Sequence, residues 1–150
     1  MRIDEVMKPG VTGFSEEELS QQKIKTFEAY LFHAIRNENA KIVYKEHPLN
    51  YKTFCTYQIS TREMDFYILL HTIYPFVTFA SEVDFSGIKF IDGPEPVKSI
   101  IAENYTVIDK ELLNQTLTQE ATITLRTAEQ KMIKYWNPKT IGEVIFNYWD

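Results

Sequence analysis

The most hydrophobic stretch of the chain covers residues 64–80 and has the sequence MDFYILLHTIYPFVTFA. A membrane-spanning helix needs about 20 consecutive apolar residues, whereas this stretch is shorter and contains Pro75 near its middle. Its Tyr, Ile, Phe, Val and Thr residues favour strands. We therefore predict two strands, 64–73 and 76–80, with a bend between them. Because both strand faces are hydrophobic, the strands should lie in the centre of a sheet covered on both sides.

Before this stretch, apolar residues recur at helical spacing. They predict a helix over residues 16–36 with one apolar face, formed by Ile24, Phe27, Leu31 and Ile35. Ser15 and Glu18 form a capping-box pattern at its start. Residues 1–13 contain Pro9-Gly10 and Gly13, which break regular structure, so we expect a loosely held lead-in.

Shorter β-type segments surround the central pair. Residues 41–46 and 52–60 predict two strands, and residues 88–91 and 105–108 predict two short ones. The two prolines within 93–96 predict an irregular loop, because proline has no backbone N–H to donate. Together these segments predict a mostly antiparallel sheet of four to six strands.

Helical signals return in the last third of the chain. Asp109 is a plausible cap for a helix over 110–117, and Thr127 with Gln130 forms a capping-box pattern for a helix over 127–135. Asn137-Pro138 should end this second helix, since a residue before proline avoids helical geometry. Residues 97–102 and 144–146 fit either a helix or a strand, and residues 119–126 have no clear pattern.

The chain therefore predicts a single α+β domain over residues 1–150. An N-terminal helix packs on the sheet, and C-terminal helices lead to an aromatic tail that should be docked on the body. A length of 150 residues and a hydrophobic content of 44% are enough for a substantial core. The N-terminal sequence MRIDEVMKPG is charged, and Cys55 is the one cysteine, so we expect a cytoplasmic protein without disulfides.

The negative charge is concentrated in one part of the chain. The net charge is −5, and residues 82–120 hold eight acidic and three basic side chains, so this segment accounts for the whole excess. Such a distribution disfavours direct binding to nucleic acid, whose phosphates require Lys and Arg. It suits a basic protein partner, although a solvated surface without a binding role has the same pattern.

Candidate catalytic residues are few. His33, His47 and His71 lack the spacing of metal ligands, and no glycine-rich phosphate loop is present. Cys55 could form a nucleophile pair with His47 or His71 if neighbouring strands brought them together. The alternative function is therefore a small-molecule-binding or enzyme domain that uses Cys55 and His71. The simpler interpretation is that both are core residues. We expect no catalytic residues, metal or cofactor.

The C-terminal stretch is distinctive. Residues 134–150, KYWNPKTIGEVIFNYWD, contain a third capping-box pattern at Thr140 and Glu143 and end in aromatic residues. This stretch resembles the ending of small immunity proteins that accompany polymorphic secreted toxins in Bacillus-like bacteria. The resemblance implies a non-catalytic cytoplasmic antitoxin that binds its cognate toxin and occludes the toxin's active site.

If the resemblance holds, the acidic segment is the natural contact surface. A nuclease toxin has a cationic substrate groove, in which clustered carboxylates can imitate phosphates. The partner-binding residues expected on this basis are Glu82, Asp84, Asp92, Glu95 and Glu103. The expected partner is a toxin protein with a basic surface, and neither nucleic acid nor a membrane is expected to bind directly.

Overall fold

The hydrophobic stretch forms two central strands of a mostly antiparallel sheet in an α+β fold. The computed structural model describes residues 1–13, 19–48 and 52–149. Five strands follow each other in space as they do in sequence: β1 (Lys41–Glu46), β2 (Phe54–Ser60), β3 (Asp65–His71), β4 (Phe76–Asp84) and β5 (Gly87–Ile91). A sixth short strand, β6 (Thr106–Val107), pairs in parallel with the start of β4.

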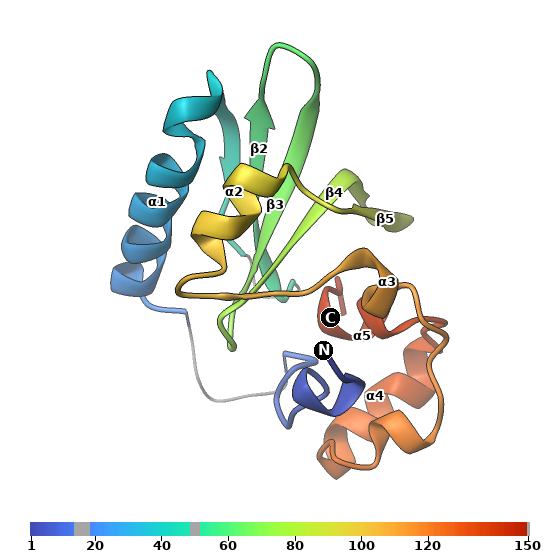
Figure 1. The fold of residues 1–150 in the computed structure, drawn as a ribbon. Coiled ribbons are helices and arrows are strands. Elements are labelled where there is room, and N and C mark those ends of the chain that lie inside the picture. Colours follow the sequence, from blue (N-terminus) through green and yellow to red (C-terminus); the bar gives the residue numbers. More distant parts are fainter. Residues whose placement is uncertain (14–18, 49–51, 150) are drawn as a thin grey trace.

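Helices cover both faces of this sheet. They are α1 (Gln21–Ile35), α2 (Glu95–Ile101), α3 (Lys110–Leu113), α4 (Thr127–Trp136) and α5 (Ile141–Ile145), with short 3-10 turns at Ile3–Glu5, Arg36–Glu38 and Glu120–Thr122. Residues of α1 and α2 pack with Cys55, on one face. The N-terminal segment, α3, α5 and the tail pack with Phe54, on the other. Figure 1 shows the two chain ends side by side, with α4 and α5 close to them.

The strand predictions agree closely with the structure, whereas two helix boundaries differ. β1 has the predicted bounds, and β4 continues beyond residue 80 to Asp84. The predicted start of the first helix at residue 16 is wrong, because α1 begins at Gln21 with Ser20 as its cap. The Ser20 side chain accepts a hydrogen bond of 3.1 Å from the backbone N–H of Lys23. The capping box predicted at Ser15 and Glu18 lies outside the described residues.

Proline explains one error in the chain's middle. The loop predicted over 93–96 ends at Pro94, because α2 begins at Glu95 with Pro94 as its cap residue and Pro96 in its first turn. The first N–H groups of a helix have no intrahelical acceptor, so proline costs little there. The predicted helix over 110–117 is shorter, since α3 ends at Leu113.

The N-terminal segment is packed into the core, so the expected loose lead-in is wrong. Val6, Met7 and Val11 are buried between the sheet and the C-terminal helices. A side chain far along the sequence holds the segment in place. The buried Glu129 carboxylate accepts hydrogen bonds from the backbone N–H groups of Gly10 (2.7 Å) and Thr12 (3.2 Å), and from the Thr12 hydroxyl.

The same carboxylate also caps the N-terminus of α4. Glu129 also accepts a hydrogen bond of 3.2 Å from the backbone N–H of Arg126, the cap residue of this helix. The capping pattern predicted at Thr127 and Gln130 is therefore displaced by one residue. One buried carboxylate thus satisfies donors from the chain's start and from the first turn of α4.

We predict that Glu129→Ala lowers the free energy of unfolding by about 2–4 kcal/mol, because buried donors lose their acceptor. Chemical denaturation of the parent and variant measures the difference. Glu103→Ala is the control, since Glu103 is exposed, and its effect should stay within about 0.5 kcal/mol. Equal stability of the two variants would contradict the role given to Glu129.

Candidate functional site

A groove of about 770 Å³ opens between the β4–β5 turn and the C-terminal segment. One wall consists of the turn residues 84–88, together with Phe90 and with Asn114 at the end of α3. The other consists of the end of α4, the loop that follows it, α5 and the tail, and it belongs to the stretch that carries the resemblance. Phe90 and Phe146, both buried, lie at the base of the groove.

The first wall is shaped by Asp84. Its carboxylate accepts hydrogen bonds from the hydroxyl and backbone N–H of Ser86 and from the backbone N–H of Gly87. These hydrogen bonds, chiefly those from Ser86, hold the pKa of Asp84 below its usual value, so the group is ionised at neutral pH. The turn carries Phe85 into solvent with 77% of its surface exposed. The ring of Phe85 lies 4.6 Å from that of Tyr148, measured between centroids.

The second wall is built by two helix ends. α4 ends at Trp136, and the cap residue Asn137 has a left-handed backbone (φ 51°) and precedes Pro138, which the sequence predicts to stop the helix. The Thr140 hydroxyl then accepts from the backbone N–H of Glu143 at 3.3 Å, and the Glu143 carboxylate accepts from the backbone N–H of Lys139. Thr140 therefore caps the start of α5 as predicted, whereas the return hydrogen bond to Glu143 comes from Lys139 and not from Thr140, so the capping box is incomplete. The Glu143 side chain lies on the groove.

Asn147 docks the tail onto the body. Its side-chain amide donates to the carbonyl groups of Thr12 (3.1 Å) and Val144 (2.8 Å), and its side-chain oxygen accepts from the backbone N–H of Trp149 (3.1 Å). The predicted docking of the aromatic tail is therefore confirmed. Trp149 itself is half-buried, packs against the core and lines the groove.

The two tryptophans of the chain meet in this groove. The rings of Trp136 and Trp149 are parallel within 1°, and their centroids are 6.4 Å apart. Trp136 has 39% of its surface exposed, which is unusual for so large an apolar side chain. Tryptophan and tyrosine are enriched in protein interfaces, where they contribute much of the binding energy.

The charged side chains of the groove all have the same sign. Its lining includes the carboxylates of Asp84 and Glu143 and, among the residues the structure describes, no lysine, arginine or histidine. Aromatic side chains and two acidic residues therefore line the same groove, and a described basic group near it, the Lys52 ammonium, lies 5.7 Å from the ring centroid of Tyr148.

Most of the acidic residues expected to bind a partner lie elsewhere. Glu82, Asp92, Glu95 and Glu103 are exposed but do not line the groove, whereas Asp84 does. Glu82 is opposite Lys89 in the β4–β5 pairing. Lys98 forms an ion pair of 2.8 Å with Asp109. This contact, with smaller contributions from Glu95 and Asp92, raises the pKa of Lys98. Local lysines thus offset part of the negative charge of the segment.

The groove lining also includes aromatic and charged residues that were not predicted to bind a partner: Phe85, Trp136, Glu143, Tyr148 and Trp149. One available signal was Phe85, an aromatic residue inside a turn sequence, where burial is difficult. The sequence pattern indicated a capping role for Glu143, and this role does not show that the side chain is also exposed. The distribution of charge along the sequence favoured the acidic segment, because it contains no information on which distant segments are neighbours in the fold.

Cys55 and His71 cannot act as a nucleophile pair. In the β2–β3 register His71 lies opposite Phe54, and Cys55 is the next residue, so its side chain points to the other face of the sheet. Burial raises the pKa of the Cys55 thiol to about 12, although the charge of Lys52 opposes this effect. The thiol is therefore protonated and packed among apolar residues of the α1 face.

His71 is a neutral core histidine. Its Nδ1 atom accepts from the backbone N–H groups of Ile73 (3.1 Å) and Tyr74 (3.2 Å), so its Nε2 atom carries the proton and donates to the Val11 carbonyl at 2.8 Å. Burial lowers the pKa of His71 to about 4, although carbonyl groups of Val11 and Ile145 work in the opposite direction. The imidazole thus fastens the N-terminal segment to the β3–β4 turn.

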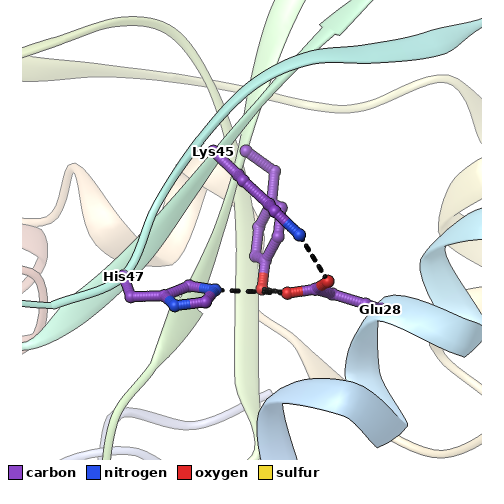
Figure 2. A network of polar contacts seen from close by, with 4 residues as sticks. Glu28, Lys45 and His47 are labelled. Carbon is purple, nitrogen blue, oxygen red and sulfur yellow. Dashed lines mark hydrogen bonds and ion pairs between the residues drawn. The ribbon is translucent and has the colours of Figure 1, made fainter.

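A second polar cluster joins α1 to the edge of the sheet. Figure 2 shows Glu28, on α1, between Lys45 and His47. Its carboxylate contacts Lys45 Nζ at 3.0 Å and His47 Nε2 at 3.3 Å, and it accepts from the Tyr57 hydroxyl at 3.0 Å. Burial alone would raise the pKa of Glu28, but these hydrogen bonds together lower it. Since the groups satisfy one another, the cluster serves to hold α1 against β1 and β2.

Comparisons of the chain with protein-family models, curated proteins and solved structures find no match. Over residues 1–13, 19–48 and 52–149, no helix is long and apolar enough to cross a membrane. The same residues contain no group of three or more His, Cys, Asp or Glu side chains suited to a metal ion.

We predict that His71 makes the protein less stable in acid. Between pH 6.5 and 4 the unfolded chain binds a proton at this histidine and the folded chain does not, so the free energy of unfolding falls as the pH decreases. The loss due to His71 should reach about 3 kcal/mol. Denaturation across this range, compared between the parent and His71→Gln, isolates the effect because other titrating groups are common to both.

His33→Gln is the matched control, since His33 is exposed on α1. This variant should retain the parent's dependence on pH. If His71→Gln does not fold, an NMR titration of the His71 imidazole in the parent decides the question. A pKa near 6.5 in the folded protein would contradict the prediction.

Proposed function

We propose that this protein is an immunity-type binding protein, which binds the toxic domain of a secreted protein and covers that domain's active site without chemistry of its own. The observation that carries the proposal is the open groove, in which aromatic side chains are exposed and the charged side chains are carboxylates. The resemblance of residues 134–150 to the ending of immunity proteins supports the same conclusion, because this stretch forms one wall of the groove.

The chemistry of the groove favours a basic protein as the partner. Trp136 and Phe85 offer apolar area that a partner can bury, and each buried Å² of apolar surface contributes about 25 cal/mol before the costs of association. Asp84 and Glu143 attract positive charge and repel phosphate, so nucleic acid is a poor candidate. A toxin that acts on nucleic acid has the required basic surface at its own active site.

The expected contact surface therefore differs from the one deduced from charge counting. Asp84 remains part of it and Glu143 joins it, both within the groove. Glu82 lies two residues before Asp84 on β4 and is exposed, so it can contribute at the rim. Asp92, Glu95 and Glu103 are assigned a lesser role, in the long-range attraction of a basic partner.

Co-expression tests the proposal. We predict that the gene beside this one encodes a secreted protein whose C-terminal domain stops growth, that this protein restores growth, and that the two form a stable complex. Trp136→Ala should weaken the complex by about 30-fold or more, as truncation of an interface anchor does. Phe32→Ala is the control: Phe32 is also exposed but lies on α1, outside the groove, and its removal should leave the affinity unchanged.

The salt dependence of binding tests the electrostatic part. The double variant Asp84→Asn, Glu143→Gln retains both hydrogen-bond acceptors, but it should bind more weakly and lose affinity less steeply as salt is added. Glu103→Gln is the charge control. Failure to bind the toxic domain, or equal losses for Trp136→Ala and Phe32→Ala, would overturn the proposal.

A further inference from the structure

We propose that the groove recognises an arginine side chain, whose guanidinium group lies flat against the Trp136–Trp149 pair and pairs with a carboxylate of the groove. This inference rests on the proposed function, because it specifies the chemistry by which a basic partner is held. It adds a defined anchor to what is otherwise a general attraction between opposite charges.

The parallel indole rings provide a surface for a planar cation. With centroids 6.4 Å apart, Trp136 and Trp149 are near the outer limit of stacked pairs, so each retains area that a third group can cover. Tryptophan is the side chain whose ring face attracts cations most strongly. A guanidinium group that lies flat on one indole is parallel to the other as well, because the two planes differ by 1°.

The carboxylates supply the ionic half of the site. Asp84 and Glu143 line the same groove as the indoles, and no described lysine, arginine or histidine lines it with them. The Oε2 atom of Glu143 accepts a hydrogen bond from the backbone N–H of Lys139. Since a carboxylate has two oxygens and about four acceptor positions, capping leaves capacity for a second donor.

Arginine matches this combination better than the other candidates. Its guanidinium group is planar and weakly hydrated, stacks on aromatic faces and donates two parallel hydrogen bonds to a carboxylate. The lysine ammonium is a compact, strongly hydrated charge that cannot stack. A neutral planar group or a sugar could cover the indoles, but it would leave the two negative charges uncompensated.

The position of the tryptophans makes a direct experiment possible. The chain has two of them, and both line the groove, so tryptophan fluorescence and the indole N–H signals in NMR report on this site alone. The probe is a short, capped glycine peptide with one central arginine. It should bind saturably, with a dissociation constant on the order of millimolar, and shift both indole signals.

Two further peptides separate charge from shape. The peptide with citrulline, which has the shape of arginine but no charge, should bind at least about tenfold more weakly, and the lysine peptide about threefold more weakly. Citrulline binding equal to that of arginine would assign the groove to neutral planar or sugar ligands and overturn the proposal. Equal binding of the lysine and arginine peptides would show that the groove attracts any positive charge, and it would overturn the proposed arginine site as well.

Variants of the protein locate the site. Glu143→Gln retains the α5 cap and should weaken arginine binding about two- to fivefold, and Trp136→Leu should do so to a similar extent. Glu103→Gln and Phe32→Leu are exposed changes outside the groove and should have no effect. Binding that is insensitive to both groove variants would overturn the proposal.

The peptide titrations do not use the toxic domain, so the two proposals can fail separately. If the arginine peptide does not bind while Trp136→Ala still disrupts the complex with the toxic domain, the binding role stands and the arginine site is wrong. If the peptide binds as expected but no toxic domain is captured, the arginine site stands and the immunity role is wrong.

Discussion

Two buried polar side chains determine how the two end segments of the chain fit together. The Glu129 carboxylate binds the N-terminal segment at Gly10 and Thr12, and the Asn147 amide binds the carbonyl group of Thr12 from the other side. A buried polar group is costly unless it is fully hydrogen-bonded, so these contacts allow essentially one arrangement. These contacts also fix the positions of the two groove tryptophans. Trp136 is on α4, whose first turn is capped by Glu129, and the backbone of Trp149 is hydrogen-bonded to Asn147.

Local patterns were sufficient to predict the sheet. Alternation and β-branched residues identified its main strands, since neighbours in sequence are neighbours in space throughout β1–β5. The N-terminal segment was misjudged because the buried Val6 and Val11 form no periodic pattern, and their partners lie at the other end of the chain. The error at α2 had a different origin: Pro94 and Pro96 break a helix interior but are compatible with its first turn.

The groove was less predictable than the fold. The sequence places Asp84 and Glu143 far apart, and only folding brings their carboxylates into one lining without a basic residue. The charge distribution along the chain predicted Asp84 but also Asp92 and Glu95, because the sequence does not show that Lys98 lies close to the latter two. The stretch that carries the resemblance, residues 134–150, forms one wall of the groove, but the sequence could not indicate which of its aromatic side chains face solvent.

The two faces of the sheet differ in how much of the chain each requires. The residues that pack on the α1–α2 face lie between positions 19 and 107, whereas the opposite face depends on contacts that join positions 117 to 135 residues apart. Closing such long loops is slow, so the second face should form late in folding. During synthesis on the ribosome, Phe54 and Leu69 lack the residues that cover them until the C-terminal helices have been made, so the incomplete chain exposes apolar surface. Such a species is prone to aggregate, and it is the state for which a chaperone would matter most.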